Sequence, residues 1–243
     1  MLSFFSKKDK FTDLSWLEID VHTHILPGFD GSASDISSAL AYIKGLSALG
    51  FRKLICAPIR SVSEDKQSIA AYHSMFMELR ESSVNISDHI DLVLAGEYLI
   101  NQTFEANSSL HVLGGNFVLI SIPDTAFDGK LSQAVFDLII RNYRPVLAHP
   151  EKYPFLAKDK KKLKRLKHKG CLLQLDLLSV TGHYGKEVRS AAISLLKDNF
   201  YDLAGTNLQN IQDLQVLQEF TQNGKIGELM GNYPFRNRAL FSS

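Results

Sequence analysis

The sequence contains little cysteine, no long hydrophobic run and almost no net charge. Its two cysteines, Cys56 and Cys171, are too few for a disulfide-rich secreted scaffold and lie in apolar segments typical of buried free thiols. A formal charge of +1 gives no overall electrostatic reason to expect nucleic-acid binding. The apolar stretch near the N-terminus is far shorter than a signal-peptide core or the roughly 20 residues of a membrane span. We therefore expect a cytoplasmic protein without a membrane span.

The remaining composition is that of an ordinary globular domain, with 45% hydrophobic and 22% charged residues in a chain of 243. Short runs rich in valine, isoleucine and leucine alternate with longer amphipathic segments, a pattern typical of strand-helix units around a parallel sheet. The expected strands are 18–21, 53–57, 91–96, 117–122, 145–148, 172–175 and 201–205. The expected helices are 35–49, 64–82, 130–141, 159–169, 186–198 and 210–222.

This alternation predicts a single α/β domain over residues 17–230, folded as a closed or nearly closed barrel. Residues 1–16 are polar and basic with scattered aromatic residues, and we interpret them as an N-terminal arm. Residues 231–243 have a similar character and are expected to form a C-terminal tail.

Residue types that bind metals follow the ends of three expected strands. His22 and His24 come after the first strand, Glu97 after the third and His149 after the fifth. Catalytic groups of such barrels collect at the carboxyl ends of the strands, so these side chains are expected to share one pocket. Alternate residues of a strand point the same way, so both imidazoles of the first pair can face one metal ion. The alternative is that they are unrelated polar residues at the barrel rim.

Four segments, in this order and spacing, resemble the PHP-type (polymerase and histidinol phosphatase) bacterial protein-tyrosine phosphatases. They are HTHILPGFD at 22–30, AGEY at 95–98, AHPEKY at 148–153 and QLDLLSVTGHYG at 174–185. The resemblance implies a distorted seven-stranded (β/α) barrel with up to three divalent metal ions, usually manganese-like. It also implies hydrolysis of phosphotyrosine in the tails of kinases that control capsule and exopolysaccharide export. His22, His24, Glu97 and His149 match metal-ligand positions of that pattern.

Five positions depart from the family pattern. Gly31 stands where the pattern has its ligating aspartate, and Ile59 replaces the histidine of Thr-Pro-His. Asn207 and Gln209 replace the aspartate and histidine after the last strand, so both become amides. Asn207 keeps one carbonyl donor, but it lacks the negative charge that would face a divalent cation. Lys152 replaces the arginine that holds the phosphate, and an ammonium lacks the planar fork of a guanidinium.

Three functions stay open on this basis. The first is a phosphatase homologue with impaired or lost catalysis that keeps a binding or regulatory role, recognising the tyrosine-rich tail of a polysaccharide-export kinase. The second is an active phosphatase or phosphoesterase with a mononuclear or dinuclear site, in which His149 or Glu151 gives acid-base help and Lys152 holds the phosphate. The third is a non-catalytic scaffold. The cofactor would be manganese, iron or zinc, with fewer ions than in the family or none, and the oligomeric state is open. Asp176 follows the sixth strand and could reach the pocket, although the matching position is polar in the family and is no established ligand.

Overall fold

Each of the seven expected apolar runs forms a strand in the computed structural model, which describes residues 11–29, 33–62, 64–84, 86, 90–101, 103–106, 110–123 and 128–242. These strands are β1 (Ile19–Thr23), β2 (Lys53–Cys56), β4 (Asp91–Leu94), β6 (Phe117–Ser121), β7 (Arg144–Ala148), β8 (Leu172–Asp176) and β9 (Leu203–Gly205). Two short strands that the sequence did not separate follow β2 and β4, namely β3 (Ile59–Arg60) and β5 (Glu97–Leu99). Pro58 lies between β2 and β3, where a residue without an N–H cannot continue a hydrogen-bonded ladder.

The strands form two sheets in which neighbouring strands are parallel. One sheet has the order β1-β2-β4 and the other β3-β5-β6-β7-β8-β9. Backbone bonds also join the end of β1 to the segment after β9, from Asn207 N to His22 O at 2.8 Å and from His24 N to Leu208 O at 2.9 Å. The predicted α/β class with parallel strands is confirmed. A single closed seven-stranded sheet is not found among the residues that the structure describes.

The six expected helices are all present, with ends that differ from the expected ones by at most two residues. They are α1 (Ile36–Ala48), α2 (Lys66–Ser83), α3 (Asp128–Ile140), α5 (Lys160–His168), α7 (Lys186–Lys197) and α8 (Ile211–Gln222). Asp35, Asp65, Asp159 and Asn210 cap α1, α2, α5 and α8 through their side chains, as expected for such residues at a helix N-terminus. Short elements lie between or after them: the 3₁₀ turn η1 (Pro150–Lys152), α4 (Pro154–Ala157), α6 (Leu177–Thr181), α9 (Lys225–Met230) and α10 (Asn237–Phe241).

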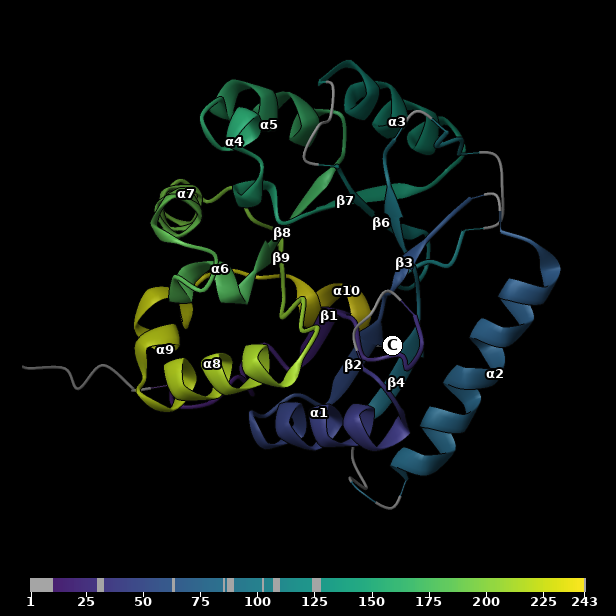
Figure 1. Cartoon of the computed structure of the whole chain (residues 1–243). Helices are drawn as coiled ribbons and strands as arrows, with labels where there is room; N and C mark the ends of the chain where they lie inside the picture. Colours follow the sequence, from purple (N-terminus) through teal and green to yellow (C-terminus); the bar gives the residue numbers. More distant parts are fainter. Residues whose placement is uncertain are drawn as a thin grey trace, which may run out of the picture.

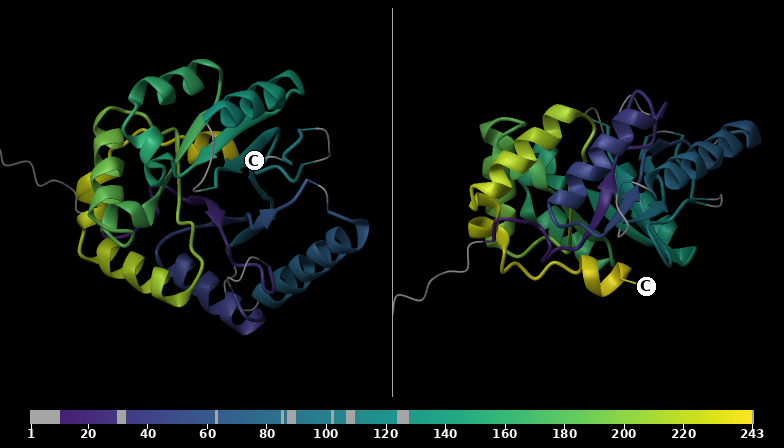
Figure 2. Two further views of the ribbon diagram at one scale, coloured as in Figure 1. Left: turned by 45° about the horizontal axis from the view of Figure 1, so that its top comes forward. Right: turned by 90° about the horizontal axis from the view of Figure 1, so that it is seen from below.

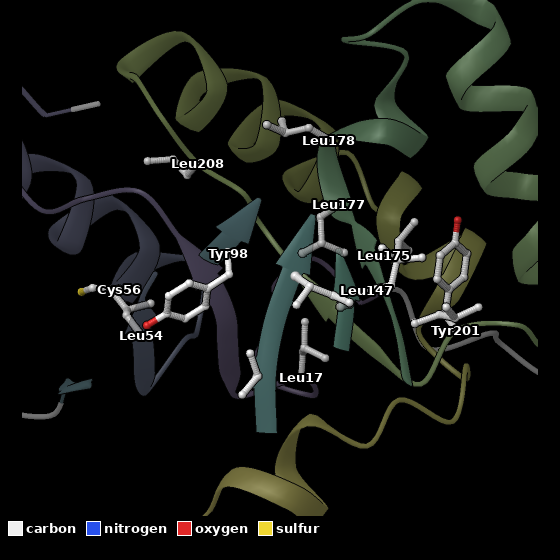
Figure 3. Close-up of a cluster of buried hydrophobic side chains, with 14 of the residues drawn as sticks. Leu17, Leu54, Cys56, Tyr98, Leu147, Leu175, Leu177, Leu178, Tyr201 and Leu208 are labelled. Carbon is white, nitrogen blue, oxygen red and sulfur yellow. The ribbon is translucent and has the colours of Figure 1, made fainter. Parts of the chain in front are cut away.

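The helices are arranged around the strands (Figures 1 and 2). The buried side chains fall into two clusters, which lie on opposite faces of the strands because side chains alternate along a strand. The larger cluster includes Leu54, Leu147 and Leu175, which Figure 3 shows together with part of their surroundings. The smaller cluster includes Val21 and Ile55 and lies on the opposite face. Among the described residues, no helix is both long enough and apolar enough to cross a membrane.

Candidate metal centre

A bulge in β1 determines where the two histidines point. Asp20 pairs with Leu54 of β2, but Thr23 pairs with Cys56, so three residues of β1 span the distance of two residues of β2. Side chains alternate between the faces of a strand, and one extra residue reverses that alternation. Beyond the bulge, His22 therefore shares a face with the side chains of the smaller buried cluster rather than with Asp20.

His22, His24 and Glu97 converge on one point in this face. His22 Nε2 lies 2.9 Å from His24 Nε2 and 3.1 Å from Glu97 Oε2, and His24 Nε2 lies 3.4 Å from the same oxygen. All three side chains are almost completely buried. These residues form a group whose ligand atoms all lie within 4.8 Å of one another.

Gln174 fixes the hydrogen positions of the first imidazole. The amide nitrogen of Gln174 donates to Leu175 O at 2.6 Å, so its Oε1, 3.2 Å from His22 Nδ1, is left to accept a hydrogen bond from the ring. In neutral His22 the hydrogen then sits on Nδ1, and Nε2 presents a lone pair toward the oxygen of Glu97. Two lone pairs 3.1 Å apart repel each other unless a positive charge lies between them.

Glu97 provides the negative charge of the cluster. Burial alone would raise the pKa of Glu97, but the positive charge and hydrogen bonds that His22 and His24 supply when protonated hold it well below its ordinary value. The carboxylate is therefore ionised at neutral pH. An ionised carboxylate beside imidazole nitrogens matches the ligand preferences of zinc, manganese and iron.

Asn207 adds a fourth donor atom. Its Nδ2 donates to Asp176 Oδ2 at 3.0 Å, so its Oδ1 faces His24 Nε2, also at 3.0 Å. The residue has φ of 49°, a left-handed conformation that asparagine tolerates better than most residues. Two nitrogens and two oxygens thus lie 2.9 to 3.4 Å from their neighbours. Such spacing fits donors that each sit about 2.0 to 2.2 Å from one shared ion.

His149 stands beside this group rather than inside it. Its Nε2 lies 3.9 Å from Glu97 Oε1, and its ring centroid lies 6.0 Å from that of His22. Burial, with the nearby charge of Lys152, lowers the pKa of His149 to about 3, so the ring is neutral. Its Nδ1 is buried and has no hydrogen-bond partner among the residues that the structure describes. The ring is thus a neutral donor at the edge of the cluster.

The side chains that follow His149 make other contacts. Lys152 Nζ lies 2.6 Å from Asp176 Oδ2 and 3.7 Å from the ring centroid of Tyr184. Glu151 accepts hydrogen bonds from Asp176 N at 3.0 Å and from Tyr201 OH at 2.9 Å. Burial, together with the charge of Asp176, raises the pKa of Glu151 to about 7. The carboxyl group of Glu151 thus ties η1 to β8, and its hydrogen bonds do not reach the histidine cluster.

Two further positions that depart from the family pattern, Ile59 and Gln209, are described by the structure, and their side chains add no ligand atom to the cluster. Ile59 pairs in register with Glu97 and is 48% exposed, so it presents an apolar side chain at the mouth. Gln209 is exposed, and its backbone N–H donates to Asp213. Gly31 lies outside the described residues.

Two residues that support the candidate site were not predicted as such from the sequence. Gln174 was not predicted at all, and Asp176 was named only as a residue that could reach the pocket. Gln174 is a fully buried polar residue within the apolar run of β8. A single polar residue in such a run was the feature of the sequence that could have indicated it. Asp176 is fully buried and links Lys152 to Asn207, which is visible only once the strands are placed side by side.

The chain resembles a group of bacterial proteins along most of its length. The family described as capsular polysaccharide synthesis, CpsB/CapC, matches residues 18–214. Tyrosine-protein phosphatase YwqE of Bacillus subtilis (strain 168) is 26% identical over 200 residues, which cover 80% of this chain and 78% of that protein. Tyrosine-protein phosphatase CpsB of Streptococcus pneumoniae is 21% identical over 204 residues, with coverage of 79% and 83%. A solved structure from work on YwqE and CpsB, described as unique metal-dependent tyrosine phosphatases, shares the fold with a TM-score of 0.76 at 22% identity and covers 92% of this chain and 91% of its own.

Proposed function

Because this chain belongs to the CpsB/CapC family of capsular polysaccharide synthesis proteins, we propose that it is a phosphatase-like regulatory protein that keeps one divalent-cation site and has lost efficient phosphotyrosine hydrolysis. Its ligand would be the tyrosine-rich tail of a polysaccharide-export kinase. The observation that carries the proposal is the convergence of His22, His24 and Glu97 around a point that needs a positive charge.

The donor set fits a divalent ion better than it fits protein hydrogen bonds alone. His22 Nε2, Glu97 Oε2 and Asn207 Oδ1 all present lone pairs, whereas a neutral His24 offers at most one hydrogen to them. A bound divalent ion would polarise a phosphoryl oxygen and lower the pKa of water. The role of the chain is to hold that ion through two imidazoles, one carboxylate and one amide oxygen.

Efficient hydrolysis also requires groups that this mouth does not offer. Asn207 brings no charge, Ile59 brings no donor atom, and Lys152 is already paired with a buried carboxylate. Changing even the partners that support metal ligands typically reduces affinity or activity by about 10- to 100-fold. Several such changes in one site should therefore reduce turnover by at least about a thousandfold.

A second candidate is an active phosphoesterase with a reduced site. His149 supports it, because its buried Nδ1 lacks a partner at the edge of the cluster and could bind a ligand group. A ring with a pKa of about 3 is a poor proton acceptor at neutral pH, however, so His149 is better suited to bind than to act as a base.

The test combines metal content with turnover. Protein purified with Mn²⁺, Fe²⁺ or Zn²⁺ should contain about one ion per chain, and His24→Ala should lose it. His168→Ala, which changes a histidine at the end of α5, should not. The B. subtilis relative, assayed in parallel on a phosphotyrosine peptide, should be faster by at least about a thousandfold. Comparable turnover would favour the active enzyme. Failure to bind any of the three ions, or binding of three ions per chain, would contradict the proposed site.

A further inference from the structure

The ion pair between Lys152 and Asp176 is joined to the candidate metal centre through Asn207, whose Nδ2 donates to Asp176 and whose Oδ1 lies beside His24 Nε2; the name mouth is used here for the region around this pair. Lys152 Nζ is 2.6 Å from Asp176 Oδ2, and the lysine side chain is 21% exposed, whereas the aspartate is completely buried. The ring of Tyr184 covers the ammonium at 3.7 Å. Lys152 is thus a cation beside the cluster that a ligand from solvent can approach.

Several contacts fix Asp176 in place. Its Oδ1 accepts from Leu178 N at 2.8 Å and caps the first turn of α6. Its Oδ2 accepts from Asn207 Nδ2 at 3.0 Å in addition to Lys152. Because the carboxylate cannot move to water, a ligand that takes Lys152 leaves a buried charge with fewer partners, which is costly.

We infer that the Asp176 carboxylate competes with anionic ligands for Lys152. Because it is paired with the ammonium of Lys152, it weakens the binding of phosphate-bearing ligands at this mouth. The inference rests on the proposed function only in assuming that such ligands enter here. A phosphate group must either displace the Asp176 carboxylate from Lys152 or share the ammonium with it, and sharing places two anions side by side. Asp176 is thus a specificity-determining residue that acts through Lys152.

The test is a double-mutant cycle read out by the affinity for inorganic phosphate and phenyl phosphate, measured calorimetrically with and without Mn²⁺. Asp176→Ser removes the carboxylate and keeps a residue type that caps helices well. In this background the affinity should rise by about tenfold or more, and Lys152→Met should abolish the gain. In the wild-type background, Lys152→Met should change the affinity by less than about threefold.

A matched control uses another ion pair, in which Nζ of Lys167, a residue of α5, lies 2.5 Å from Oδ2 of Asp202, the residue before β9. Asp202→Ser removes one negative charge and releases one lysine away from the mouth, so phosphate affinity should not change. The inference is wrong if Asp176→Ser does not raise the affinity for phosphate. It is also wrong if Lys152→Met in the wild-type background weakens phosphate binding by threefold or more, because Lys152 would then bind phosphate despite Asp176. If Asp176→Ser does not fold, Asp176→Asn takes its place in the cycle, because asparagine also caps helices well and has no charge; the same gain and the same loss with Lys152→Met are expected. The measurements without Mn²⁺ test this inference independently of the proposed cation site. A protein that bound no metal would contradict the proposed cation site but not the inference about Asp176.

Discussion

Replacing Gln174 with methionine should weaken metal binding while changing the stability of the metal-free protein only slightly. Gln174 is fully buried, and its Oε1 lies 3.2 Å from His22 Nδ1. Methionine has a similar length and shape but accepts hydrogen bonds only weakly. The substitution therefore removes the group that keeps the hydrogen of His22 on Nδ1 and leaves the packing nearly intact.

The two states of the protein respond differently to this change. Without metal, His22 can move its hydrogen to Nε2 and donate to Glu97, which lies 3.1 Å away. A large part of the penalty for an unpaired buried group, about 1–3 kcal/mol, is then avoided. With metal bound at Nε2, the hydrogen must stay on Nδ1, where methionine offers no adequate acceptor.

We therefore expect Gln174→Met to weaken Mn²⁺ or Zn²⁺ binding by about 10- to 100-fold, equivalent to about 1.4–2.7 kcal/mol. The melting temperature of the metal-free protein should change much less than that of the metal-loaded protein. Competition with a chelator gives the affinity, and the ¹⁵N shifts of the imidazole report which nitrogen carries the hydrogen. Gln133→Met, on the exposed face of α3, serves as the control. A folded Gln174→Met variant that binds metal within twofold of the wild type would refute the tautomer argument.

Three further predictions concern buried residues of the strands and of the segments packed against them. Gly205→Ala should abolish metal binding and lower the melting temperature, because the new Cβ would lie 2.8 Å from His22 Cβ; metal content and thermal denaturation check this. Burial raises the pKa of Cys56 and of Cys171 to about 12, so neither should be alkylated by iodoacetamide at about pH 8 until denaturant is added, as mass spectrometry would show. Asn237→Ala should destabilise the fold by about 3 kcal/mol in urea titrations, because Asn237 makes three hydrogen bonds to the backbones of β1 and β9 in a buried position.

Local patterns in the sequence predict most of the helices and strands. They do not predict how the strands pair into sheets, because that depends on contacts between residues far apart in the chain. Apolar runs and helical periodicity identify seven strands and six helices, because each is long enough to show its period. The strand β3 has two residues and α4 has four, which is too short for any periodic signal. Whether the strands close into one sheet depends on the contacts of β1 with the segment after β9, almost the whole chain away.

The candidate site shows the same division. The spacing of His22 and His24 places their side chains on one face, but only the bulge in β1 determines that this face meets Glu97. The contact between His22 and Gln174 spans 152 positions, and no local motif announces it. Residue types at strand ends thus indicate which side chains are candidates, whereas their hydrogen-bond partners require the tertiary structure.

The charges of the described mouth explain why one divalent ion is the expected content. Two carboxylates belong to the described group of candidate ligands and their side-chain partners: Glu97 directly, and Asp176 through Asn207. Lys152 neutralises Asp176, so this group carries one net negative charge, and a single divalent ion would leave one net positive charge. A second divalent ion would leave three net positive charges on the same group, which is costly where water is largely excluded. On the proposed function, we therefore expect the amide at position 207 to limit how many ions this group holds, in addition to removing a ligand charge.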